Sequence, residues 1–110
     1  MKIVHLISGG DSGGAKTHIF SLLQELGRTE RVLLICFRAG PFSMEAQALG
    51  IPTEVIAQKN VFRVLRELKK RISEEQFDII HCHGSRANLM GALLLRSMQI
   101  PVVSTIHSDY

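Results

Sequence analysis

The stretch GGDSGGAKT, residues 9–17, directly follows a short apolar run and carries the residue types that bind phosphate. Gly10, Lys16 and Thr17 match the G-x-x-x-x-G-K-[ST] loop that wraps the phosphates of ATP. The last glycine of that loop is replaced by Ala15, whose Cβ obstructs the positive-φ conformations that turn backbone N–H groups toward an anion. Four glycines exceed what a tight strand-to-helix turn needs, so the stretch favours an anionic ligand such as a diphosphate, whether of ATP or of another molecule.

Two histidines in HCHGSRAN have the spacing of metal ligands at the end of another apolar run. In a strand, His81 and His83 point to one face and Cys82 to the other. Two ligands make an incomplete metal site, so we expect these histidines to fill polar space at the rim of a sheet and no metal to bind. His83, Gly84 and Ser85 stand where the strand turns into a helix, which makes them candidate substrate contacts.

The remaining histidines differ in their surroundings. His107 follows the last apolar run, between Thr105 and Asp109, which suits a functional residue better than a packing one. His5 lies inside the first apolar run and is interpreted as structural, whereas the role of His18 stays open. The apolar runs end in His or Ser rather than in the Asp that holds the magnesium ion of an ATPase.

A basic segment stands out near the middle of the chain. It contains one acidic residue, Glu67, among the cations Lys59, Arg63, Arg66, Lys69, Lys70 and Arg71. Such a run is most often a solvated helix face. The alternative is a face that docks on anionic lipid or another acidic surface.

Short apolar runs alternate with amphipathic segments along the chain. They predict strands over 2–8, 31–37, 53–57, 77–84 and 101–108, separated by helices over 14–28, 40–52, 60–76 and 85–100. The strands lack polar alternation, which is typical of a parallel sheet covered on both faces. We therefore predict a Rossmann-like, three-layer α/β/α fold with a five-stranded parallel sheet of order 3-2-1-4-5.

That order gathers the unusual polar residues at one place. In such sheets, ligands bind outside the carboxyl ends of the strands, at the switch between the first and fourth strands. Those ends carry Ser8–Gly14, His81–Ser85 and His107–Tyr110.

Two local details also follow from the pattern. In the second helix, Met44, Ala48 and Leu49 are expected to face the core. Ser85 is expected to cap the last helix.

Length and composition narrow the function classes. The 110 residues make one small domain or a piece of a larger protein, and a net charge of +3 does not argue for nucleic acid. Cys36 and Cys82 lie inside apolar runs, which indicates buried thiols in a reducing compartment. With no signal-peptide pattern and no run of membrane-spanning length, we expect a cytoplasmic protein.

Three motifs occur in order at the expected elements: G-G-A-x-x-H, H-x-H-G and T-x-H. Together, MKIVHLISGGDSGGAKTHIFSLLQEL and FDIIHCHGSRANLMGALLLRSMQIPVVSTIHSDY resemble the N-terminal domain of glycosyltransferase family 4 along the whole chain. The resemblance implies a retaining enzyme of the GT-B fold, in which two Rossmann-like domains face each other across the active site.

The resemblance also implies roles for single residues. Gly13 and Gly14 would approach the donor diphosphate, and His107 would contact the donor sugar as the catalytic-site histidine. The acceptor side would be bordered by Lys16, His18, His83, Gly84 and Ser85. Lys16 departs from the family, which commonly has Glu at this position, so the type of acceptor stays open.

For the whole protein, the resemblance implies a nucleotide-sugar donor, a glycan or lipid acceptor, and neither metal nor cofactor. Residues 1–110 would be part of the acceptor-side domain, and the nucleotide-binding C-terminal domain would be its missing partner. We expect the chain alone to be inactive and prone to self-association. Two alternatives stay open: a P-loop-like nucleotide-binding or ATPase fragment, and a non-catalytic module that docks at the inner face of the membrane.

Overall fold

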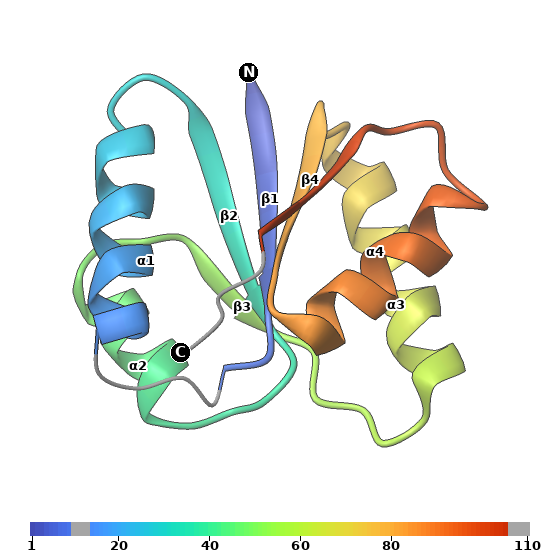
Figure 1. The fold of residues 1–110 in the computed structure, drawn as a ribbon, viewed down its shortest axis with the longest axis horizontal. Coiled ribbons are helices and arrows are strands. Elements are labelled where there is room, and N and C mark those ends of the chain that lie inside the picture. Colours follow the sequence, from blue (N-terminus) through green and yellow to red (C-terminus); the bar gives the residue numbers. More distant parts are fainter. Residues whose placement is uncertain (10–13, 106–110) are drawn as a thin grey trace.

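Five parallel strands form a sheet that is covered by helices on both faces (Figure 1). The computed structural model describes residues 1–9 and 14–105. The strands are β1 (Lys2–Ile7), β2 (Arg31–Cys36), β3 (Thr53–Val55), β4 (Ile79–His83) and β5 (Val102–Thr105). Their order is β3-β2-β1-β4-β5, so the predicted fold class and strand order are confirmed.

The helices are divided between the two faces of the sheet. They are α1 (Gly14–Leu26), α2 (Pro41–Ala48), α3 (Val61–Glu75) and α4 (Ser85–Leu95). Figure 1 shows α1 and α2 on one side of the sheet and α3 and α4 on the other. No helix among the described residues is long and apolar enough to cross a membrane.

Alternation along the strands divides the core into two clusters. In β1, Val4 and Leu6 join the cluster under α3 and α4, whereas Ile7 joins the cluster under α1 and α2. Cys82 lies in the first cluster and Cys36 in the second, and both thiols are buried as predicted. β1 is therefore buried on both faces, which explains why its sequence shows no polar alternation.

The inward face of α2 differs from the prediction. Phe42 is buried and packs on Phe20 of α1 with 4.9 Å between ring centroids, whereas Met44 is 68% exposed. Leu49 and Ala48 are also exposed. The aromatic Phe42 takes the inward position because its ring has the largest apolar area to bury in this helix.

The residues that precede α3 and α4 begin these helices in different ways. Asn60 caps α3, where its Oδ1 accepts a 2.8 Å hydrogen bond from the backbone N–H of Phe62. The prediction that Ser85 caps α4 is wrong: Gly84 holds that position with φ +94° and makes no side-chain cap, and Ser85 is the first helical residue. The sharp turn from β4 into α4 requires a positive φ, which glycine adopts without strain.

Candidate functional site

The carboxyl ends of β1, β4 and β5 lie level with one another. Ile7 pairs with His83, and His83 pairs with Thr105. The carboxyl ends of these strands therefore lie at one edge of the sheet, on either side of the point where the order switches from β1 to β4. This is the position at which open parallel sheets bind ligands.

The glycine-rich loop begins with a residue that has to be glycine. Gly9 has φ +91°, and a Cβ there would lie 3.0 Å from the carbonyl oxygen of Arg38 and 3.2 Å from Cβ of Cys36. Gly9 thus packs tightly over the end of β2. Gly14 is the first residue of α1, whose helix N-terminus favours an anion. Gly13 lies outside the described residues, so its predicted contact with a diphosphate stays a prediction.

Lys16 forms an ion pair that the sequence does not predict. Its Nζ lies 2.8 Å from Oε2 of Glu45 on α2, and its side chain is 27% exposed. The ammonium group is therefore held toward α2. His18, one residue after Thr17, lies exposed on α1.

The H-x-H-G motif is split between the interior and the surface. His83 is 3% exposed, and its Nε2 lies 3.1 Å from Nδ1 of His5. Gly84 is partly exposed and Ser85 is fully on the surface at the start of α4. Of the predicted acceptor contacts in this motif, Gly84 and Ser85 are the accessible ones, and His83 lies beneath them.

Three histidines come together on the sheet face that carries α1. His5 is opposite His81 in the register of β1 and β4, and the rings of His81 and His83 stack with centroids 4.2 Å apart. Burial, followed by the positive charges that His83 and His81 can take up, lowers the pKa of His5 to about 3. His5 is therefore neutral at pH 7.

Sequence reasoning interpreted His5 as structural and did not connect it with the H-x-H pair. The signal was present, because the predicted order places the first strand beside the fourth. Residues of both strands that share a face then become neighbours.

Two arginines at the same edge were also missed. Arg38 follows the end of β2, and Arg86 lies in the first turn of α4 with its guanidinium carbon 6.0 Å from the ring centroid of Phe37. Both are exposed. They add positive charge where an anionic ligand would meet the helix N-termini. Their positions directly after a strand and at a helix start were the signal that could have found them.

The catalytic histidine of the prediction, His107, lies outside the described residues. Its proposed contact with a donor sugar stays a prediction. Thr105, at the end of β5, is the described residue nearest to it in the chain.

The basic face of α3 is smaller than the sequence predicts. Arg71 does not join it, because its guanidinium makes ion pairs with Glu54 at 2.6 Å and Glu75 at 2.8 Å. The hydrogen bonds that the guanidinium donates to the carboxylates of Glu54 and Glu75 raise the pKa of Arg71. Of the six cations predicted for this face, those that are exposed and make no ion pair with another described residue are Lys59, Arg63, Arg66 and Lys70.

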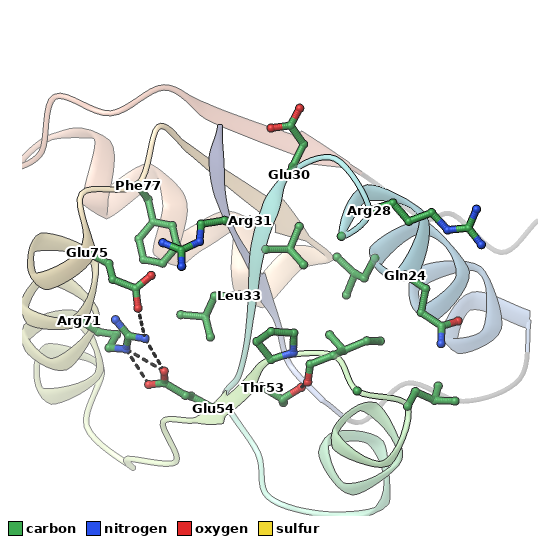
Figure 2. Close-up of a pocket in the computed structure, with 17 residues that line it drawn as sticks. Gln24, Arg28, Glu30, Arg31, Leu33, Thr53, Glu54, Arg71, Glu75 and Phe77 are labelled. Carbon is green, nitrogen blue, oxygen red and sulfur yellow. Dashed lines mark hydrogen bonds and ion pairs between the residues drawn. The ribbon is translucent and has the colours of Figure 1, made fainter.

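A groove of about 1050 Å³ lies at the opposite end of the sheet. Figure 2 shows the ion pairs of Arg71 with Glu54 and Glu75 along one side of it. Its lining includes Arg31 at the start of β2 and Thr53 at the start of β3, so it lies at the amino ends of the strands. The groove is therefore separate from the edge that carries the glycine-rich loop.

Comparisons with known proteins agree with this architecture. Residues 12–110 match the family model of Glycosyltransferase Family 4. UDP-Gal:alpha-D-GlcNAc-diphosphoundecaprenol alpha-1,3-galactosyltransferase of Escherichia coli is 31% identical over 81 residues, which make up 67% of this chain and 21% of that protein.

Solved structures resemble the chain in fold. The structure of HepE from Anabaena in complex with UDP-glucose has a TM-score of 0.84 at 23% identity, over 98% of this chain and 29% of that one. A glycosyltransferase from Rickettsia africae has a TM-score of 0.81 at 17% identity, over 99% of this chain and 30% of that one. The chain thus spans about a fifth of the curated relative. Since the family match extends from the glycine-rich loop to Tyr110, this chain belongs to Glycosyltransferase Family 4.

Proposed function

We propose that this chain is the acceptor-side part of a retaining glycosyltransferase that moves a sugar from a nucleotide-activated donor to an acceptor. One observation carries the proposal: the family match begins in the glycine-rich loop, which leaves β1 at the switch point of the sheet. A diphosphate is the part of such a donor that a helix N-terminus and nearby arginines can hold.

In this proposal the donor and acceptor lie over the same edge. Gly13 and Gly14 approach the donor diphosphate with their backbone N–H groups, and Arg38 and Arg86 supply positive charge near it. His107 contacts the donor sugar. The acceptor side is formed by Lys16, His18, Gly84 and Ser85, and the buried His83 supports Gly84 from below.

A uridine diphosphate sugar and a lipid-linked acceptor are the substrates we propose. The Escherichia coli relative is named for a UDP-galactose donor and a diphosphoundecaprenol-linked acceptor, and HepE was crystallised with UDP-glucose. Neither metal nor cofactor is needed by this proposal, because the protein's own cations and backbone dipoles act on the diphosphate.

A lipid-linked acceptor requires contact with a membrane, and the α3–α4 layer offers a suitable surface. Next to the exposed cations of α3, Phe62 is 79% exposed, and on α4 Leu89 and Leu95 are more than half exposed. No acidic residue occurs between Asp78 and Asp109. Apolar side chains with cations around them suit a peripheral contact with the anionic inner face of the membrane, where we place the protein.

The ATPase alternative has less support. In a P-loop the lysine reaches the β- and γ-phosphates, whereas Nζ of Lys16 is held by Glu45. Family membership also favours sugar transfer over ATP hydrolysis.

The test uses the full-length protein that contains this chain. Nucleotide release is measured with a panel of UDP-, GDP- and ADP-sugars and with polyprenyl-diphosphate-linked sugars as acceptors, in wild type and His107→Ala. We expect transfer by wild type from a UDP-sugar, loss of transfer in the variant, and unchanged circular dichroism. Hydrolysis of ATP without any sugar transfer would overturn the proposal.

A further inference from the structure

Three histidines form a cluster on β1 and β4, and only His83 among them has a part in the proposed transfer reaction, as the support of Gly84. His5 of β1 and His81 and His83 of β4 each offer one ring nitrogen, and these three nitrogens lie within 4.8 Å of one another. The H-x-H pair was expected to be incomplete as a metal site. β1, the neighbour of β4 in the sheet, supplies the third imidazole.

We propose that His5, His81 and His83 form a binding site for one Zn²⁺ ion between β1 and β4. Three imidazoles with an open fourth position are a known zinc ligand set. Of its three residues only His83 is also assigned to the acceptor side of the proposed function, and Zn²⁺ binding is measured without any sugar transfer.

The distances are those of a site that needs little rearrangement. Zinc binds imidazole nitrogen at about 2.0–2.1 Å, so two ligands of a tetrahedral ion lie roughly 3.3 Å apart. Nδ1 of His5 and Nε2 of His83 are already 3.1 Å apart. His81 is partly exposed and is the ligand that a side-chain rotation has to bring closer.

The strands hold the ligands in place. Residues on one face of a strand alternate with those on the other, so His81 and His83 have to share a face, and pairing of His5 with His81 fixes the third ligand beside them. Ligands carried by a buried sheet are positioned more firmly than ligands on loops. The partial exposure of His81 also provides a path by which an ion enters.

The protonation states suit a metal. A ligating histidine has to be neutral, and the full burial of His5 favours the uncharged ring. In the metal-free protein one proton lies between His5 and His83. On metal binding it moves to the other nitrogen of the same ring, which leaves two lone pairs facing the ion, so charge and protons balance.

The second ring nitrogen of His5 is buried as well. His5 is fully buried, and its Nε2 has no hydrogen-bond partner within residues 1–9 and 14–105. A buried polar atom without a partner is rare in a folded protein. Because Nε2 is the ring nitrogen that does not face His83, zinc bound at Nδ1 does not account for it, and the proposal rests on the geometry of the three imidazoles.

The test measures Zn²⁺ and Co²⁺ binding directly, after removal of metal with a chelator. Isothermal titration calorimetry gives the stoichiometry and affinity for Zn²⁺, and the visible absorption of Co²⁺ reports tetrahedral coordination. The variants are His5→Gln, His81→Gln and His83→Gln, and the matched control is His18→Gln on the exposed surface of α1.

We expect one Zn²⁺ per chain, an affinity at least tenfold weaker in each cluster variant, and a change of less than twofold in His18→Gln. His5→Gln changes a buried residue and can disturb the fold. His81 is partly exposed, so His81→Gln is the deciding variant. Absence of saturable binding, or full affinity in His81→Gln, would refute the site.

Discussion

Nδ1 of His5 lies 3.1 Å from Nε2 of His83, so two buried imidazoles on neighbouring parallel strands share one hydrogen bond. Only one of the two rings can donate in this bond, and a second proton on the pair would place like charges side by side away from water. The cluster therefore favours neutral histidines in the folded state.

This relationship predicts a loss of stability in mild acid. The pKa of His5 falls from 6.5 to about 3 on folding, so the unfolded chain takes up a proton below pH 6.5 and the folded chain does not until about pH 3. Stability is thus lost as the pH falls through this window, by about 2 kcal/mol between pH 7 and pH 5. Urea unfolding with chelator present measures it.

The comparison that isolates His5 uses two variants. His5→Asn is expected to flatten the difference in unfolding free energy between pH 7 and pH 5, whereas His18→Asn keeps it. An equal pH dependence in wild type and His5→Asn would assign the acid sensitivity to other groups.

Close packing of α4 on the sheet predicts a costly glycine substitution. A Cβ at Gly91 would lie 2.5 Å from Sγ of Cys82 and 3.0 Å from Cγ1 of Val102. We expect Gly91→Ala to destabilise the chain by about 1–3 kcal/mol, although alanine is the better helix former by about 1 kcal/mol.

The same measurement can identify the clash. In a Cys82→Ala background the nearest remaining atom of residue 82 is Cβ at 3.8 Å, an ordinary contact. In that background Gly91→Ala should lower the free energy of unfolding, measured with urea, by at least about 0.5 kcal/mol less than it does in the wild type. Such a difference is a coupling energy between the two sites. Strict additivity of the two substitutions would place the strain elsewhere.

The exposed cations of α3 predict salt-sensitive binding to anionic vesicles. We expect Arg63→Gln with Arg66→Gln to weaken binding roughly tenfold or more, since each cation near an anionic surface adds about 1 kcal/mol at low salt. The matched control is Arg28→Gln with Arg31→Gln, which removes equal charge near the groove at the amino ends of the strands.

Vesicle flotation at low and high salt is the measurement. Equal loss of binding in both double variants would mean that net charge alone drives the contact. Unchanged binding in Arg63→Gln with Arg66→Gln would leave the α3 face as an ordinary solvated surface.

Sequence alone predicts the sheet because its signals are local and repeated. Apolar runs, helix periods and glycine stops fix which segments are strands, and the handedness of parallel connections fixes their order. Which side chains of a helix face the core depends on contacts with residues of other elements, and the sequence does not show these contacts. Phe42, and not Met44, faces inward on α2 because it packs on Phe20. Arg71 does not belong to the basic face because it forms an ion pair with Glu54.

The candidate site is likewise predictable in its location and not in its individual contacts. Strand ends predict where the polar residues gather, and the structure confirms that the ends of β1, β4 and β5 are level. The pairing of Lys16 with Glu45 and of His5 with His83 joins segments that are far apart in the chain or on different elements. Such pairs depend on the packed arrangement and not on spacing.

The last prediction is that residues 1–110 fold alone but transfer no sugar. Folding is expected because the strands β1, β2 and β4 are buried between two apolar clusters that involve all four helices. Transfer is not expected, because a donor diphosphate develops further negative charge as the sugar leaves, and stabilising it requires cations fixed around it.

At the glycine-rich edge the described cations are too few and too open for that task. Arg38 and Arg86 are exposed to water, and Lys16 is already paired with Glu45. Water in an open site screens the remaining attraction, whereas a facing domain would exclude it. The outer part of β5 also leaves Val103 46% exposed, so the chain is expected to associate with itself.

The purified 110-residue chain is mixed with the same nucleotide sugars and acceptors as the full-length protein, and released nucleotide is measured. Circular dichroism and size-exclusion chromatography establish folding and association in the same samples. We expect a folded, self-associating chain with no release above the buffer control, beside clear release by the full-length protein. Transfer by the chain alone would mean that its own residues complete the site, and would require the donor contacts to be reassigned to this one domain.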